Sequence, residues 1–121
     1  MSDEKELRWV GSSYEDLCAF PELVRHDAGF ELGKVQAGFD PSDWKSFEAV
    51  GSGTREIRIR DACGIFRVMY VAKFAEAIYV LHCFQKKTET TSKRDKEIAQ
   101  VRYRAVIEMR KEKHETDRHK N

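Results

Sequence analysis

The spacing of apolar residues changes along the chain from a helical period to a strand period and back again. Residues 22–38 hold apolar side chains three or four positions apart, which predicts a helix. Residues 55–84 alternate between apolar and polar side chains, which predicts strands. Residues 92–110 return to helical spacing. This order predicts an α+β fold, in which an N-terminal helical pair and a C-terminal helix pack on a small antiparallel β-sheet.

The first forty residues predict a short strand followed by two helices. Residues 7–9 suggest the strand, and Ser13 with Asp16 has the form of a capping box that opens the first helix. Pro21 ends this helix or opens the next one, because proline lacks an amide donor and clashes with the preceding turn. Gly38 is the expected end of the second helix. The apolar residues of that helix are Leu23, Val24, Ala28, Leu32 and Val35.

Three runs rich in β-branched and aromatic residues form the predicted sheet, at residues 55–60, 65–71 and 78–84. The links between these runs are short, which favours an antiparallel meander. Trp44 and Phe47 lie in an irregular segment before the sheet. We expect their rings to fill core space, although aromatic rings can also stack on bases.

A second capping box, Ser92 with Asp95, predicts the start of the last helix. A narrow apolar stripe on this helix is expected to dock on the sheet. The stripe consists of Ile98, Val101, Ala105 and Met109. Residues 111–121 are almost entirely polar, so we expect this tail to fray. Residues 1–121 are expected to form a single domain.

The length of 121 residues excludes a large multidomain enzyme. Charged residues make up 36% of the chain, but seven Phe, four Tyr and two Trp supply enough core material to exclude disorder throughout. No apolar run is long enough for a membrane span, and the first residues lack the apolar region of a signal peptide. We therefore expect a cytoplasmic protein without a membrane partner.

Three cysteines, Cys18, Cys63 and Cys83, lack the spacing of a metal site. An odd number without a CxxC pair suits reduced thiols in the cytoplasm better than disulfides. Cys83 adjoins His82, but neighbours on a strand point to opposite faces and cannot share a metal. We expect neither a metal nor a cofactor.

The formal charge of +1 hides an uneven distribution. Residues 1–50 carry five Lys or Arg against eleven Asp or Glu, a net charge of −6. Residues 51–121 carry seventeen against ten, a net charge of +7. The second part of the chain is therefore where a polyanion is expected to bind.

Basic residues gather in the predicted sheet. Alternation places Arg58 and Arg60 on one face of the first run, together with Glu56. Arg67 lies in the second run among apolar residues, where a cation needs a partner or a ligand. The basic residues that follow the third run are Lys86 and Lys87. In a meander these cations converge at the edge of one sheet.

Such a cluster suits phosphate chemistry, because guanidinium groups bind phosphate in a bidentate manner and stabilise the charge that develops when a phosphodiester is attacked. Crowding by arginines also disfavours the ammonium form of a lysine, which brings it nearer to service as a general base. A solvated sheet face with paired charges is the alternative. His82 has a suitable pKa for proton transfer, but a single histidine in this strand also fits a hydrogen-bonded core residue.

Three motifs in a fixed order are specific when taken together: Glu56-Ile57-Arg58, Phe66-Arg67-Val68, and the run from His82 to Thr88. With matches elsewhere from Trp9 to Tyr103, they make the chain similar to the phage-derived HigB-like toxins of type II toxin–antitoxin systems, within the RelE superfamily. The resemblance implies a RelE-like fold. It also implies an mRNA interferase, a metal-independent endoribonuclease often dependent on the ribosome, and inhibition by a helix-turn-helix, HigA-like antitoxin.

In the mechanism that the resemblance implies, the 2′-hydroxyl of RNA attacks the adjacent phosphate. Arg67 would hold the scissile phosphate, and Lys86 would transfer a proton or stabilise charge. The implied catalytic residues are Arg67, Lys86, Arg60 and His82, and the implied RNA- or phosphate-binding residues are Arg58, Arg60 and Lys87. Tyr103 lies well inside the predicted last helix, so we do not assign it to the site.

Two alternatives to this enzyme stay open from the sequence. One is a non-catalytic module whose basic face only holds RNA or an acidic protein. The other is an inactive phage remnant that keeps only the surface for the antitoxin. The resemblance also does not identify which group takes the proton of the 2′-hydroxyl, because no clear counterpart of the acidic and histidine residues used by other HigB-like toxins is present near the chain end.

Overall fold

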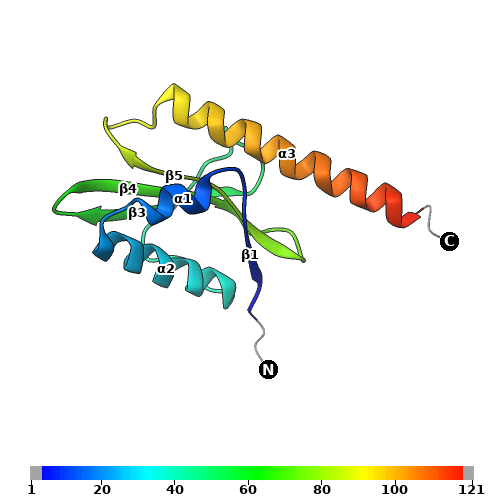
Figure 1. Cartoon of the computed structure of the whole chain (residues 1–121), viewed down its shortest axis with the longest axis horizontal. Coiled ribbons are helices and arrows are strands. Elements are labelled where there is room, and N and C mark those ends of the chain that lie inside the picture. The colour runs from blue at the N-terminus through cyan, green and yellow to red at the C-terminus, as the bar shows by residue number, and fades with distance from the viewer. Residues whose placement is uncertain (1–3, 119–121) are drawn as a thin grey trace.

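The computed structural model describes residues 4–118, and it shows a five-stranded sheet with helices on both faces (Figure 1). The elements are β1 (Glu6–Trp9), α1 (Ser13–Cys18), α2 (Glu22–Gln36), β2 (Trp44–Ser46), β3 (Thr54–Asp61), β4 (Gly64–Val71), β5 (Ala77–Lys86) and α3 (Lys93–Arg118). α1 and α2 pack on one face of the sheet, and α3 packs on the other. This architecture confirms the predicted α+β fold.

The strand order in the sheet is β1-β5-β4-β3-β2. β3, β4 and β5 form the predicted antiparallel meander. β1 pairs in parallel with β5, but only from Ala77 to Val80, so the rest of β5 lies beyond the end of β1. β2 pairs antiparallel with β3 and occupies the segment for which the sequence predicted no element. Trp44 lies in this strand and is half-buried, whereas Phe47 packs against the core as expected.

α2 buries one stripe against the sheet. Val24, Ala28, Leu32 and Val35 belong to this core, but Leu23, which was predicted with them, is 71% exposed. The reason is geometric: successive residues on a helix are rotated by about 100°. Leu23 therefore cannot share the stripe of its neighbour. The helix begins after Pro21 and ends before Gly38, as predicted, and Gly38 has a φ of 91°, which glycine adopts without strain.

α3 docks through a stripe that differs from the predicted one. Ala99, Tyr103 and Val106 are buried, whereas Val101 is 59% exposed and Met109 is 39% exposed. The helix is thus rotated relative to the prediction. Its start is correct, because the Ser92 hydroxyl donates to the carboxylate of Asp95 at 2.7 Å and accepts from the Asp95 amide at 3.1 Å.

Tyr103 explains the orientation of α3. A Cβ placed on Gly51 would lie 2.4 Å from the Tyr103 ring, so the ring occupies the space that this glycine leaves open. The Tyr103 hydroxyl donates a hydrogen bond to the Ser52 carbonyl at 2.7 Å. Because the Tyr103 ring has both this space and a hydrogen-bond partner, α3 packs on the sheet through Tyr103 rather than through the aliphatic residues of the predicted stripe.

The cap predicted for α1 is wrong by one residue. Ser13 is the first residue of the helix, and it is buried with its hydroxyl donating to the Val80 carbonyl at 2.9 Å. Ser12 occupies the cap position instead, and its hydroxyl donates to the carboxylate of Asp16 at 2.8 Å. Ser13 therefore fastens α1 to β5 rather than capping the helix.

A β-bulge in β5 changes which side chains share a face. Tyr70 pairs with Val80, while the residue before Tyr70 pairs with His82, so Leu81 is an extra residue in β5. Strict alternation would put Val80, His82 and Phe84 on one face. In the structure Val80 packs on the α2 side and Phe84 on the α3 side, with the His82 ring stacked on Phe84 at 4.8 Å.

The polar tail predicted to fray is helical as far as Arg118, and residues 111–116 are exposed. Residues 119–121 lie outside the described part of the chain. Among residues 4–118, none of the helices combines the length and the apolar character needed to cross a bilayer.

Candidate phosphate-binding site

The register of the meander gathers four cations on one face of the sheet. Arg58 of β3 lies opposite Arg67 of β4. One row further along, Arg60 lies opposite Ile65, which lies opposite Lys86 of β5. Cross-strand partners point to the same face. We call Arg58, Arg60, Arg67 and Lys86 the basic cluster; it lies on the face that also carries α3.

A buried carboxylate lies beside this cluster. Glu56 is fully buried, and its Oε1 atom lies 3.6 Å from Nη1 of Arg67 and 3.9 Å from Nζ of Lys45. The Thr91 hydroxyl donates to its other oxygen at 3.3 Å. A buried charge is costly unless it is paired. Glu56 therefore fixes the positions of Arg67 and Lys45 from beneath the surface.

Arg67 has more hydrogen-bond donors than partners. Its side chain is only 4% exposed, and within residues 4–118 neither Nε nor Nη1 makes a hydrogen bond. Burial lowers the pKa of Arg67; Glu56 opposes this shift, and Arg58 and Arg60 add to it by repulsion. Unpaired donors on a buried cation favour a ligand with anionic oxygen atoms.

Arg58 and Arg60 differ in their freedom to bind a ligand. Arg58 is one-third exposed, and its Nε donates to the carboxylate of Asp43 at 3.0 Å. Arg60 is exposed, and within residues 4–118 it has no ion pair. A phosphate therefore meets Arg60 without competition, whereas it must compete with Asp43 for Arg58.

Lys86 and Lys87 lie in different environments. Lys86 is half-buried, and its pKa is lowered by burial first and then by the positive charges of Arg67 and Lys45. Lys87 lies beyond the end of β5, is exposed, and donates to the side-chain oxygen of Gln85 at 3.1 Å. The structure thus brings Lys86 into the basic cluster and leaves Lys87 outside it.

His82 is held by the start of α3. Its Nε2 atom lies 2.7 Å from the carboxylate of Asp95, which also accepts from Ser92. Its Nδ1 atom is buried without a hydrogen bond in the described part of the chain. Burial lowers the pKa of His82, and Asp95 opposes that shift. His82 therefore resembles the hydrogen-bonded core histidine more than a freely exchanging acid.

Sequence reasoning missed Lys45 and Asp95 as neighbours of the candidate residues. Lys45 lies opposite Glu56 only because β2 joins the sheet. The sequence around β2 does not alternate between apolar and polar residues, so it did not predict a strand. Asp95 was recognised as a helix cap, but its second partner, His82, is set by the way α3 packs. A capping motif alone does not reveal a side chain reached through tertiary structure.

No metal site is apparent among residues 4–118, where His, Cys, Asp and Glu form no group of three or more able to hold an ion. Cys18 and Cys63 are exposed and Cys83 is buried, with burial raising the pKa of its thiol. The basic cluster itself offers cationic hydrogen-bond donors, with Lys86 as a group whose lowered pKa favours proton transfer more than that of an ordinary lysine.

A small α+β domain with one basic sheet face is the class of protein that the fold and the site define. A family model described as "Phage derived protein Gp49-like (DUF891)" matches residues 15–104. The chain belongs to this family, which lies within the RelE toxin group and is a phage-derived, toxin-like family. No curated protein matches the chain, and no solved structure does so either.

Proposed function

We propose that this protein is the toxin of a type II toxin–antitoxin system of the HigB-like kind, and that it cleaves mRNA as a metal-independent endoribonuclease in the cytoplasm. The single observation that carries the proposal is the convergence of Arg58, Arg60, Arg67 and Lys86 on one sheet face. Membership in a toxin-like family supports it independently.

The reaction needs a cationic site and a proton acceptor, but no metal. The 2′-hydroxyl gives its proton to the acceptor as its oxygen attacks the adjacent phosphorus, the bond to the 5′-oxygen breaks, and the leaving oxygen takes up a proton from water. The products are a 2′,3′-cyclic phosphate and a 5′-hydroxyl. Negative charge develops on the phosphoryl oxygens on the way. Fixed donors aimed at this charge accelerate the step, because they require no reorganisation.

Each member of the basic cluster has a distinct part in this proposal. Arg60, exposed and free of ion pairs in the described chain, binds the RNA backbone. Arg67 has donors without a hydrogen bond but is buried, so it reaches the scissile phosphate by moving outward from its place beside Glu56. Lys86 accepts the proton of the 2′-hydroxyl, which its lowered pKa favours, or in its ammonium form stabilises the charge of the transition state.

The remaining residues have supporting parts. Arg58 clamps a flanking phosphate after exchanging Asp43 for it, and Lys87 contacts the RNA beyond the end of β5. His82 is the less favoured acid, because Asp95 occupies its Nε2 atom. Glu56 is fully buried, so it positions Arg67 and does not touch RNA.

Partners follow from the same proposal. The ribosome presents the mRNA, since a cluster of four cations is a modest site that does not bind RNA tightly on its own. A helix-turn-helix, HigA-like antitoxin inhibits the toxin. An acidic element of that antitoxin covering the basic cluster is the simplest means of blocking RNA.

The experiment is a cell-free translation reaction to which the purified chain is added without antitoxin. We expect cleavage of the translated transcript, and a loss of at least about 100-fold in rate for Arg60→Ala and for Lys86→Ala. Both side chains reach solvent, so their removal leaves the core intact. Arg25→Ala, which removes an exposed arginine of α2, is the control and keeps the wild-type rate.

Binding and cleavage are separated by a substrate that lacks the nucleophile. A transcript with a 2′-deoxy nucleotide at the cleavage position is expected to bind and to stay intact. Salt-sensitive binding of the ordinary transcript without any cleavage product supports the non-catalytic module instead. Binding of the antitoxin alone, without either property, supports the inactive remnant.

A further inference from the structure

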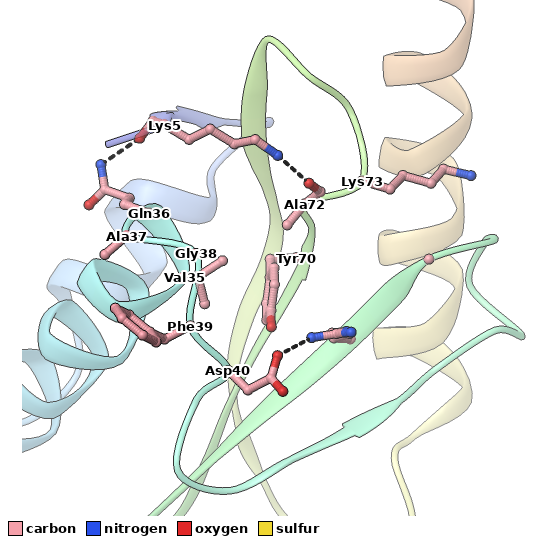
Figure 2. A pocket seen from close by; sticks show the side chains of 12 residues that line it. Lys5, Val35, Gln36, Ala37, Gly38, Phe39, Asp40, Tyr70, Ala72 and Lys73 are labelled. Atoms are coloured by element: carbon pink, nitrogen blue, oxygen red, sulfur yellow. Dashed lines mark hydrogen bonds and ion pairs between the residues drawn. The ribbon is translucent and has the colours of Figure 1, made fainter. Parts of the chain in front are cut away.

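A cationic pocket lies on the opposite face of the sheet from the basic cluster. It has a volume of about 440 Å³ and lies between the C-terminal end of α2, the start of β3 and the end of β4. Figure 2 shows Lys5 reaching across this pocket from Gln36, which donates to its carbonyl, to the carbonyl of Ala72. The volume falls in the range of small-molecule sites.

Tyr70 provides an unpaired polar group in this pocket. Its side chain is fully buried, and its hydroxyl donates no hydrogen bond within residues 4–118; burial raises the pKa of Tyr70, and the nearby guanidinium of Arg55 opposes this shift. Figure 2 shows the Tyr70 ring between the end of α2 and Asp40. A buried hydroxyl without a partner costs free energy. The hydroxyl is therefore available to donate to a group that enters the pocket.

The charges that line the pocket are mainly positive. Lys5, Arg55 and Lys73 line it together with one carboxylate, Asp40. Arg55 donates to Asp40 at 2.8 Å, and its guanidinium stacks over the Trp44 ring at 4.0 Å, which holds it in place. Lys73 is exposed, and its ammonium lies 5.3 Å from the centre of the Phe74 ring and points away from the pocket in Figure 2, so this side chain contributes to the charge near the pocket and must turn to contact a ligand. The lining residues carry a net charge of +2.

We propose that this pocket binds a phosphate monoester. A monoester carries a charge of about −1.5 to −2 at pH 7, which matches the charge of the lining. Arg55 and Lys5 contact the phosphoryl oxygens, and the Tyr70 hydroxyl donates to one of them. The remaining volume takes the organic part of the ligand against Phe39, an aromatic residue that lines the pocket and is 68% exposed. The site lies apart from the basic cluster and does not depend on ribonuclease activity.

Substitution of Asp40 is expected to strengthen phosphate binding, whereas substitution of Arg55 or Tyr70 weakens it. The carboxylate competes with the phosphate for Arg55, and it is 65% exposed, so it can leave without disturbing the core. Asp40→Asn is therefore expected to tighten phosphate binding several-fold. Arg55→Gln and Tyr70→Phe are expected to weaken it, the first by at least about tenfold and the second by about fivefold.

The test is an NMR titration of the full chain at constant ionic strength with inorganic phosphate, AMP and a 5′-phosphorylated RNA dinucleotide. We expect saturable shifts at the amides of Gly38 and Gly53, which line the pocket. Binding of AMP without the dinucleotide assigns the site to a small phosphate, and equal binding assigns it to an RNA end. Both results support the phosphate monoester.

Two results overturn the proposal. One is the absence of saturable shifts at these amides with about 10 mM of each probe, a concentration far above most specific affinities. The other is an affinity that Arg55→Gln, Tyr70→Phe and Asp40→Asn all leave unchanged. Arg104→Gln removes an exposed arginine on α3 and is the matched control, which keeps the wild-type affinity. Equal ionic strength of sodium chloride produces no shifts at these amides.

Discussion

The guanidinium of Arg67 lies 3.6 Å from the carboxylate of Glu56, and neither side chain is more than 4% exposed. A pair of this kind contributes little net stability, because removing both charges from water costs nearly as much as their attraction returns. The role of the pair here is to hold the Arg67 side chain in place. Glu56 holds Arg67 beside Arg58 and one row from Arg60 and Lys86, which keeps four like charges on one sheet face.

Breaking this pair on one side is expected to be more harmful than removing it altogether. Glu56→Gln leaves Arg67 buried without a counter-charge and is predicted to lower the free energy of unfolding by about 3 kcal/mol. In the cycle of the wild type, Glu56→Leu, Arg67→Met and the double variant, the double variant is predicted to lose about 2 kcal/mol less free energy of unfolding than the sum of the losses in the two single variants. Urea unfolding of the four proteins in this cycle measures the difference, and strictly additive losses contradict the pairing.

Lys86 is expected to lose its proton at a lower pH than an ordinary lysine, because partial burial and the charges of Arg67 and Lys45 lower its pKa. Lys45→Gln removes one of these charges, so the pKa of Lys86 is predicted to rise. An NMR titration of the Lys86 side chain measures both values. Lys93→Gln, at an exposed position on α3, is the control and leaves the pKa unchanged. A pKa that does not respond to Lys45 contradicts this account of the cluster.

His82 is expected to make the fold sensitive to mild acid. Burial lowers its pKa in the folded protein, while Asp95 and Asp16 raise it and Arg102 lowers it further, so the folded state resists protonation. An unfolded histidine takes up a proton near pH 6.5. The unfolded state then binds more protons, and the free energy of unfolding falls as the pH is lowered from about 7.5 to about 5.5.

Replacement of His82 is the check on that pH dependence. His82→Gln is predicted to flatten the change in the free energy of unfolding across this pH interval. His26→Gln, at an exposed position on α2, is predicted to leave the slope as it is in the wild type. Urea unfolding at the two pH values gives both slopes, and an equal slope in His82→Gln assigns the acid sensitivity to another group.

Gly51 is expected to be essential for docking α3. A Cβ at this position would lie 2.4 Å from the Tyr103 ring, so Gly51→Ala must displace the ring and is predicted to cost about 1 to 3 kcal/mol. Gly29→Ala is the matched control, because no atom lies within 4 Å of its added Cβ. That change is predicted to stabilise α2 by about 0.5 to 1 kcal/mol. Equal effects of both variants on thermal unfolding contradict the proposed packing.

The sequence was most informative where a period was long and unambiguous. Alternation from Arg55 to Phe84 predicted the three strands of the meander, and the charges on them predicted that cations would share a face. The pairing register of β3 with β4 is then strongly constrained, because a shift of one residue would exchange the faces of Arg58 and Ile57. The proximity of Arg58 and Arg67 could therefore be predicted from the sequence alone.

Other features depended on contacts between distant segments. The choice between two apolar stripes on α3 is made by the fit of Tyr103 against Gly51, which lies on a loop far away in sequence. The bulge at Leu81 removes His82 from the face of Val80, and no local period reveals an inserted residue. Lys45 was missed for the same reason, since β2 is a strand only through its pairing with β3.

The most direct test of the central proposal is to map transcript ends after the purified chain is added to a translating cell-free system. The account predicts new ends with a 5′-hydroxyl, each matched by a 2′,3′-cyclic phosphate on the upstream fragment. It further predicts that Lys86→Ala and Arg60→Ala suppress these ends while retaining the circular dichroism spectrum of the wild type. Transcripts that stay intact with the folded wild-type protein contradict the proposal that the basic cluster cleaves RNA.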